Sequence, residues 1–368
     1  MNSAVKGPED LKKEVLDRNL CSSCGLCVGM CPYIKTVRDR AVMIHPCGLK
    51  EGNCYRVCPR TGVDARVMDN AVFGSERSDQ ALGFNRGVYF ARALSPEKAR
   101  AGQYGGVVTA LTAFALEQGI ISGAVMAGGS PSSPEPFLAK NEAGVTSCAG
   151  SKYTAVPTLT SLNRAARDGM ENLGVVGRPC QVTAVRKGQQ IGRENPGSLT
   201  FAGSAGLVIG LFCFWSLNPD FYGFLREKSG GSAIQRVDIP IEGLTLTTAG
   251  GTATWPVDEI RPYIREACQS CIDCTSEWAD LSVGSTEYDP AWNTLVVRSG
   301  AGQSLVNDAV EKGIIEIKSY PEERLPILRK AVLNKKMRVL EGSGGPGAGY
   351  ITVGDYAGEV KKQWEVLQ

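Results

Sequence analysis

Cysteine stands out in this chain: 13 of the 368 residues are cysteines, and the one histidine is His45. The polar N-terminus lacks the apolar stretch of a secretory signal, so we expect a cytoplasmic protein whose thiols stay reduced. Free thiols at this density favour metal binding, cluster binding or redox chemistry over disulfides. A serine triad or a histidine-rich zinc site would depend on His45 alone, and both are disfavoured.

The first cysteine group lies within residues 21–58. Its beginning has the spacing C-x2-C-x2-C-x3-C-P of bacterial ferredoxins, formed by Cys21, Cys24, Cys27 and Cys31 with Pro32. In that motif three thiolates hold one cubane and the fourth reaches a second cluster. The spacing predicts a small ferredoxin-like iron–sulfur domain over residues 1–70. The alternatives are buried free cysteines and a zinc ribbon, although zinc needs only four thiolates.

The thiols of this group divide unequally between two clusters. By ferredoxin logic one [4Fe-4S] cluster is held by Cys21, Cys24, Cys27 and Cys58, and a second cluster by Cys31, Cys47 and Cys54. The second set lacks a fourth cysteine. We therefore expect a [3Fe-4S] cluster there or, as we favour, a cubane completed by another group. Candidates for the fourth ligand are His45, which lies two residues before Cys47, and a distant cysteine, Cys148 or Cys274. The alternative interpretation of Cys148 and Cys274 is that they are small buried apolar residues.

The second cysteine group, Cys268 with Cys271, supplies only two ligands. Cys180 and Cys213 lie at the ends of apolar runs that we expect to be strands. Ligand-binding loops gather at strand ends in an open α/β sheet, so four thiolates from separate elements can converge on one cluster there. The alternative is that Cys268 and Cys271 form a dithiol redox pair. The sequence around them lacks a thioredoxin-like setting, which counts against this alternative.

Alternating apolar strands and helices occupy residues 87–340, which predicts an α/β fold with a mostly parallel open sheet. The expected strands are Gly123–Ala127, Leu173–Gly177, Leu207–Cys213, Thr294–Arg298 and Ile314–Lys318. The expected helices are a short one within residues 1–20, Val107–Gln118, one ending near Gln190, Ser304–Lys312 and, in a C-terminal tail of residues 341–368, Glu359–Leu367. Residues 59–86 are interpreted as a linker, and Gly129–Pro136 and Gly342–Gly349 as loops.

Charge and hydropathy exclude two classes of function. The formal net charge is only +2, from 40 basic and 38 acidic residues, and no basic stripe is present, so nucleic-acid binding is a poor hypothesis. The longest apolar run, Ala205–Trp215, is shorter than the ~20 residues that span a bilayer, and we expect no membrane span.

Several sequence blocks between residues 87 and 300 carry a family resemblance. They are Gly102–Leu111, Ala149–Tyr153, Val175–Gln181, Gly210–Cys213 and Cys268–Asp273 with Ala279–Gly284. In type and order these blocks resemble the coenzyme F420 hydrogenase/dehydrogenase beta-subunit family, which includes 7-hydroxymethyl chlorophyll a reductase. The resemblance implies a flavoprotein with FAD and a [4Fe-4S] cluster on Cys180, Cys213, Cys268 and Cys271. The chain departs from the family pattern at Tyr104, Cys148 and Cys274.

The same blocks contain the residues expected to bind FAD. These are Gly105, Gly106, Thr109, Ser151, Lys152, Tyr153, Gly177, Arg178, Pro179 and Gln181. Two glycines at a helix start provide backbone amides and a positive dipole end, which suit a pyrophosphate. The 151–153 block supplies a hydroxyl, a charge and a stacking ring, and the 177–179 turn brings a guanidinium beside a cluster cysteine.

The resemblance implies electron transfer between a hydride carrier at FAD, a deazaflavin or a nicotinamide, and a chain of iron–sulfur clusters. The iron–sulfur clusters would lead to a partner subunit of a hydrogenase, formate dehydrogenase or heterodisulfide-reductase-like complex. Hydride transfer at a flavin needs no side-chain acid or base, so no catalytic residue is assigned. The alternatives are a self-contained ferredoxin-dependent reductase of an organic substrate and a ferredoxin-like carrier without flavin. No complete G-x-G-x-x-G fingerprint indicates a separate nicotinamide domain.

Overall fold

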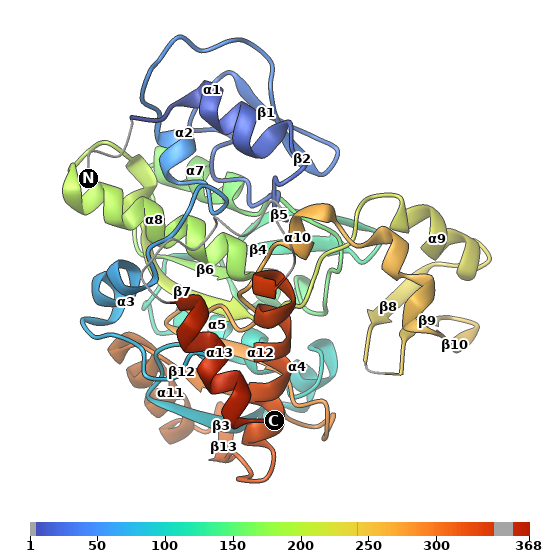
Figure 1. The fold of residues 1–368 in the computed structure, drawn as a ribbon. Coiled ribbons are helices and arrows are strands. Elements are labelled where there is room, and N and C mark those ends of the chain that lie inside the picture. The colour runs from blue at the N-terminus through green and yellow to red at the C-terminus, as the bar shows by residue number, and fades with distance from the viewer. Residues whose placement is uncertain (1–4, 241, 342–355) are drawn as a thin grey trace.

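A computed structural model describes residues 5–240, 242–341 and 356–368 of the chain. Within these ranges the centre is an eight-stranded sheet with helices on both faces (Figure 1). The strand order is β13 (Ile315–Ser319), β3 (Gly87–Ala93), β12 (Asn293–Val297), β11 (Leu281–Ser285), β7 (Ala205–Leu211), β6 (Leu173–Gly177), β4 (Gly123–Ser130), β5 (Ser133–Ala139). Strands β11, β7, β6 and β4 are parallel, and antiparallel pairs flank them. The predicted α/β class with an open sheet is confirmed, and its parallel strands form the centre.

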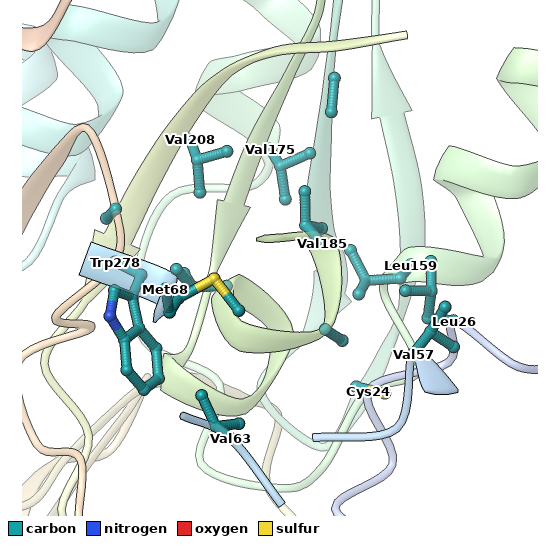
Figure 2. Close-up of a cluster of buried hydrophobic side chains, with 14 of the residues drawn as sticks. Cys24, Leu26, Val57, Val63, Met68, Leu159, Val175, Val185, Val208 and Trp278 are labelled. Carbon is teal, nitrogen blue, oxygen red and sulfur yellow. The ribbon is translucent and has the colours of Figure 1, made fainter. Parts of the chain in front are cut away.

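Side chains of the central strands alternate between two buried cores, as the two-residue period of a strand requires. Val175 and Val208 belong to one core, whereas Val176 and Ile209 belong to the other. The first core is covered by α3 (Ala65–Phe73), α7 (Leu159–Arg167), α8 (Pro179–Glu194), α12 (Leu325–Glu341) and α13 (Tyr356–Val366). The second is covered by α5 (Val107–Glu117), α6 (Glu142–Ser147) and α11 (Gly300–Glu311). Figure 2 shows the first core, where Val175 and Val208 lie near Val185 of α8.

Most predicted elements of the α/β region are confirmed. Strand β6 has the predicted bounds, and α5 ends one residue earlier than predicted. Helix α11 begins at Gly300, earlier than predicted, because the Ser299 hydroxyl accepts a hydrogen bond from the Gly302 amide and caps the helix. In α13, Val360 is buried and Trp364 packs against the first core. The predicted loop Gly342–Gly349 lies outside the described residues.

The prediction of a linker over residues 59–86 is wrong in its middle, where α3 forms. The Asp64 carboxylate accepts a hydrogen bond from the Val67 amide at the start of the helix, and Gly74, with a φ of 69°, ends it. Asp69 and Arg77 are buried as an ion pair. Two of the charges that suggested a linker are therefore buried against the fold.

The prediction of a loop over Gly129–Pro136 is also wrong. Strands β4 and β5 form a hairpin that pairs Ser130 with Ser133 and Gly129 with Pro134. Because β5 is the edge strand of the sheet, its prolines interrupt no further hydrogen-bond ladder.

The N-terminal cysteine segment lies over α7 and α8, at the top of Figure 1. It contains α1 (Pro8–Leu11), a π-helical turn (Lys12–Leu16), the hairpin β1 (Ile34–Val37) with β2 (Arg40–Met43), and α2 (Asn53–Arg56). The helical turns fall within the helix predicted for residues 1–20, and Leu11 and Val15 are buried.

A second small sheet was not predicted. It consists of β8 (Ile234–Asp238), β9 (Leu244–Thr248) and β10 (Gly251–Trp255), and with α9 (Phe221–Lys228) it projects from the side of the molecule (Figure 1). Phe221, Leu225 and Leu244 are among the residues of its own core. In the described ranges, no helix is long and apolar enough to cross a membrane.

Candidate cofactor and cluster sites

A cavity of about 510 Å³ lies at the carboxyl ends of the parallel strands. Val176 near the end of β6 and Leu211 at the end of β7 line it, and Ala331 of α12 lies on its wall. This volume is within the range of ~300–1,000 Å³ that is usual for small-molecule and cofactor sites. Strand ends at the centre of a parallel sheet are also the usual place for such a site.

Seven of the ten residues expected to bind FAD line this cavity: Gly106, Thr109, Ser151, Lys152, Tyr153, Arg178 and Gln181. Gly105, Gly177 and Pro179 do not. Gly105 instead packs against the sheet, because a Cβ at this position would lie 2.8 Å from the Ala91 carbonyl oxygen.

The start of α5 forms a tightly packed part of the wall. Gly106 has a φ of 69°, and a Cβ there would lie 2.5 Å from the Lys98 carbonyl oxygen. The Val107 amide already donates to the Asn293 Oδ1 at 3.2 Å, so it is not free for a ligand. Tyr104 also lines the cavity and has a φ of 57°. Such a backbone conformation is costly for a tyrosine, and strain of this kind gathers at functional sites.

Lys152 does not present a free charge to the cavity. Its Nζ donates to the carbonyl oxygens of Cys148, Ala149 and Gly150 at 2.7, 2.9 and 3.1 Å. Burial lowers the pKa of Lys152. The ammonium therefore shapes the loop of the 151–153 block.

Tyr153 joins this loop to the small projecting sheet. Its hydroxyl donates to the Asp238 Oδ1 at 3.0 Å and accepts from the Gln103 Nε2 and the Ile239 amide. Burial raises the pKa of Tyr153, so the phenol stays neutral. These hydrogen bonds hold Tyr153 in place, and Tyr153 lines the cavity.

Arg178 lies where the cavity meets the second cysteine group. One guanidinium nitrogen, Nη1, donates to the Ser216 hydroxyl, whereas Nη2 is buried and has no partner among the described residues. Burial alone would lower the pKa of Arg178, but the thiolates of Cys180, Cys213 and Cys268 raise it overall. Because a buried unpaired donor costs about 1–3 kcal/mol, Nη2 fits an anionic group in the cavity or between the cysteines.

The four thiols of Cys180, Cys213, Cys268 and Cys271, here called the C-terminal cysteine box, come from three separate segments. Cys180 is the second residue of α8, Cys213 follows β7, and Cys268 lies on the short helix α10 (Glu266–Gln269). The Ser216 amide donates to the Cys268 Sγ at 3.3 Å, which joins two of these segments. Cys213 also lines the cavity.

Cys274 lies beside the box. Its carbonyl oxygen accepts from the Cys213 amide at 2.8 Å, and its side chain is fully buried. Burial raises the pKa of Cys274 to about 12, with the Asp273 carboxylate and the Cys271 thiolate acting in the same direction and Lys335 against them. No three Cys, His, Asp or Glu side chains among the described residues lie close enough to hold a single metal ion. The thiols of the box instead suit an iron–sulfur cluster, because each iron atom of such a cluster takes a different thiolate.

The first N-terminal set is brought together. Cys21, Cys24, Cys27 and Cys58 line one small cavity. Burial raises the pKa of Cys58 to about 11. Burial also raises the pKa of Cys24, and the thiolates of Cys58 and Cys180 add to this effect. Cys24 therefore lies near enough to the C-terminal cysteine box to interact with it electrostatically.

The second N-terminal set is also close together. Burial raises the pKa of Cys54 to about 11, and the thiolates of Cys31 and Cys47 raise it further. His45 is exposed and its ring packs edge-on against Tyr33, 5.8 Å between centroids. Neither distant cysteine joins this set, because Cys148 and Cys274 both line the large cavity. Their interpretation as buried residues is supported by exposures of 5% and 0%.

Three polar side chains of the α/β part hold the N-terminal segment, and sequence reasoning missed all of them. Asn163 Nδ2 donates to the Leu26 and Val28 carbonyls at 2.7 and 2.8 Å. Lys187 Nζ donates to the Cys58 carbonyl at 2.8 Å, and Arg265 Nη2 to the Cys21 carbonyl at 2.8 Å. No spacing rule identifies such contacts, which depend on the tertiary fold. Because all four acceptor carbonyls belong to a cysteine or to a residue next to one, the contacts fix the N-terminal cysteines relative to the α/β part.

Comparisons with known proteins identify the family of the chain. The profile described as coenzyme F420 hydrogenase/dehydrogenase, beta subunit N-term, matches residues 88–163, and the profile of its C terminus matches residues 170–323. The chain is 34% identical over 264 residues to the coenzyme F420 hydrogenase subunit beta of Methanothermobacter thermautotrophicus, covering 69% of this chain and 92% of that one.

Two further relatives extend the comparison. The coenzyme F420-dependent sulfite reductase of Methanocaldococcus jannaschii is 28% identical, covering 88% of this chain and 52% of that protein. A chain of the F420-reducing [NiFe] hydrogenase complex from Methanosarcina barkeri is 28% identical with a TM-score of 0.66, covering 72% of this chain and 92% of that one. The chain therefore belongs to the coenzyme F420 hydrogenase/dehydrogenase beta subunit family, a family of oxidoreductase subunits.

Proposed function

We propose that this chain is an FAD- and iron–sulfur-dependent oxidoreductase subunit. It passes electrons between a hydride carrier, a deazaflavin or a nicotinamide, and a chain of iron–sulfur clusters that leads to a partner subunit. Candidate partners are hydrogenase, formate dehydrogenase or heterodisulfide-reductase-like subunits, or a ferredoxin. The relatives, a coenzyme F420 hydrogenase subunit and a coenzyme F420-dependent sulfite reductase, support a redox complex that uses coenzyme F420.

The observation that carries this proposal is the wall shared by the cavity and the C-terminal cysteine box. Arg178 and Cys213 line the cavity; Cys213 belongs to the box, and Arg178 interacts electrostatically with three of its thiols. On the far side, Cys180 acts electrostatically on Cys24 of the N-terminal segment. These positions support our proposed electron path from the cavity through the box to the N-terminal thiols.

The proposed ligands are the sets described above: Cys21, Cys24, Cys27 and Cys58; Cys31, Cys47 and Cys54; Cys180, Cys213, Cys268 and Cys271. The first and third sets suit [4Fe-4S] clusters, and the incomplete second set suits a [3Fe-4S] or [4Fe-4S] cluster. Bound FAD would supply the conversion between two-electron hydride transfer and one-electron transfer. In this cavity Arg178 would provide a positive charge to the bound group, and Val176 and Leu211 would provide part of an apolar wall.

Anaerobic rapid mixing of the chain, purified with its cofactors, tests the proposal. With reduced coenzyme F420, and separately with NADPH, we expect one donor to bleach the flavin absorbance and then the broad iron–sulfur absorbance. Free FAD mixed with the same donors is the control. If neither donor reduces the flavin, but reduced ferredoxin does and an organic substrate is turned over by the isolated chain, the self-contained reductase is correct. If the purified chain contains no flavin, the remaining alternative is a ferredoxin-like carrier.

A further inference from the structure

Lys335 is a buried ammonium between two cysteine-bearing loops. It lies on α12, beyond the residues that the family profiles match, and is 4% exposed. Its Nζ donates to the carbonyl oxygens of Cys213 and Asp273, each at 2.7 Å. One of these loops follows β7 and the other contains Cys271, so a single side chain joins two parts of the C-terminal cysteine box.

The charge of Lys335 lacks a carboxylate partner within ion-pair distance among the described residues. Lys335 contacts Asp273 only through the Asp273 backbone carbonyl. The Asp273 carboxylate instead accepts hydrogen bonds from the amides of Thr275 and Glu277. Burial alone would lower the pKa of Lys335, whereas the thiols of Cys271, Cys274 and Cys213 in their ionised form, and after them the Asp273 carboxylate, raise it. A buried charge without a counter-ion is costly, so this position fits a large anionic group at the box.

The neighbouring residue, Lys336, shows what an ordinary buried ion pair looks like on the same helix. It is fully buried, and its Nζ pairs with the Glu277 Oε1 at 2.6 Å and donates to the Gln80 carbonyl and the Tyr356 hydroxyl. Its charge is therefore neutralised by a carboxylate. Lys335 and Lys336 differ in their electrostatic partners and not in burial, which makes Lys336 a matched control.

We propose that Lys335 is a positioning residue that raises the reduction potential of the cluster held by the C-terminal cysteine box. Reduction adds one electron to the cluster, with no bond formed and no proton required, and so makes it more negative. A nearby ammonium in a dry interior stabilises this form more than the oxidised one. The inference rests on the proposed function only in placing a cluster at this box.

The position of α12 gives this effect a role in the electron path. Ala331, one turn before Lys335 on the same helix, lines the cavity. The helix therefore touches the cavity with one turn and the cysteine box with the next. A higher potential at the box favours movement of an electron out of the cavity at the first step.

The test is a redox titration followed by electron paramagnetic resonance, on anaerobically purified full-length Lys335→Gln, Lys335→Arg and Lys336→Gln proteins. We expect K335Q to lower one cluster's midpoint potential by at least about 59 mV, a tenfold change in a one-electron equilibrium, without loss of iron. K335R restores the potential because it keeps the charge. K336Q lowers the thermal unfolding midpoint and leaves all potentials unchanged.

Two outcomes overturn the inference. One is a K335Q protein with full iron and unchanged potentials; flavin and iron at the expected content would then leave the proposed function intact. The other is loss of the cluster in both K335Q and K335R, because the site would then depend on the shape of lysine and not on its charge. If K335Q alone loses the cluster and K335R keeps it at the wild-type potential, the charge is required and the inference stands. Wild-type protein without flavin or a cluster at the box would instead count against the proposed function.

Discussion

Replacing Cys180 with alanine is expected to remove the cluster of the C-terminal cysteine box and to isolate the cavity from the N-terminal clusters. Cys180 lies at the start of α8, and its thiolate acts on Arg178 at the cavity wall and on Cys24 in the N-terminal segment. The variant should contain about four fewer irons per chain and retain its flavin. Rapid mixing with the hydride donor should still bleach the flavin, without later bleaching of the N-terminal clusters.

The matched control is Cys274→Ser. Cys274 is fully buried beside Cys271 but lies outside the proposed ligand set. We expect C274S to keep its iron and to transfer electrons as the unchanged protein does. The ligand assignment would be overturned if C274S lost four irons per chain and Cys180→Ala kept them.

Replacing Arg77 with methionine is expected to lower the free energy of unfolding by about 3–5 kcal/mol. Arg77 is almost fully buried, and its guanidinium donates to both Asp69 oxygens, at 2.6 and 2.7 Å, and to Glu277. Methionine fills much of the same space but leaves the Asp69 carboxylate buried without its cation. Urea unfolding should show the loss as a lower midpoint.

Arg66→Met is the control for this experiment. Arg66 pairs with Glu359 at 3.0 Å, but its side chain is 52% exposed. Exposed ion pairs contribute about 0–1 kcal/mol, so we expect a shift much smaller than that of R77M. Equal urea midpoints for the two variants would show that the buried ion pairs of Arg77 with Asp69 and Glu277 do not stabilise the fold.

The parts of the fold that could be predicted are those where local pattern decides the structure. Strand β6 is a continuous apolar run, as expected for a strand buried on both faces, and its bounds were predicted correctly. Helix α3 was missed because its Asp69 and the following Arg77 are buried as a pair that only the tertiary fold brings together. The hairpin of β4 and β5 was missed because prolines at a sheet edge resemble a loop in sequence.

The same distinction applies to the candidate sites. Cysteine spacing was sufficient to group Cys21, Cys24 and Cys27 with Cys58, and the structure places these thiols around one small cavity. Spacing could not show that the Lys152 ammonium is held by three carbonyls. Nor could it identify Lys335, because its contacts reach loops about 60 and 120 residues earlier in the chain. Such long-range polar contacts leave no periodic signal.

The measurement that tests the central claim most directly is the content of iron, acid-labile sulfide and flavin per chain, in protein purified without oxygen. We expect about one flavin with about eleven or twelve irons and a matching amount of sulfide, as three clusters require. About eight irons with no flavin would contradict electron transfer from a flavin in the cavity to the C-terminal cysteine box.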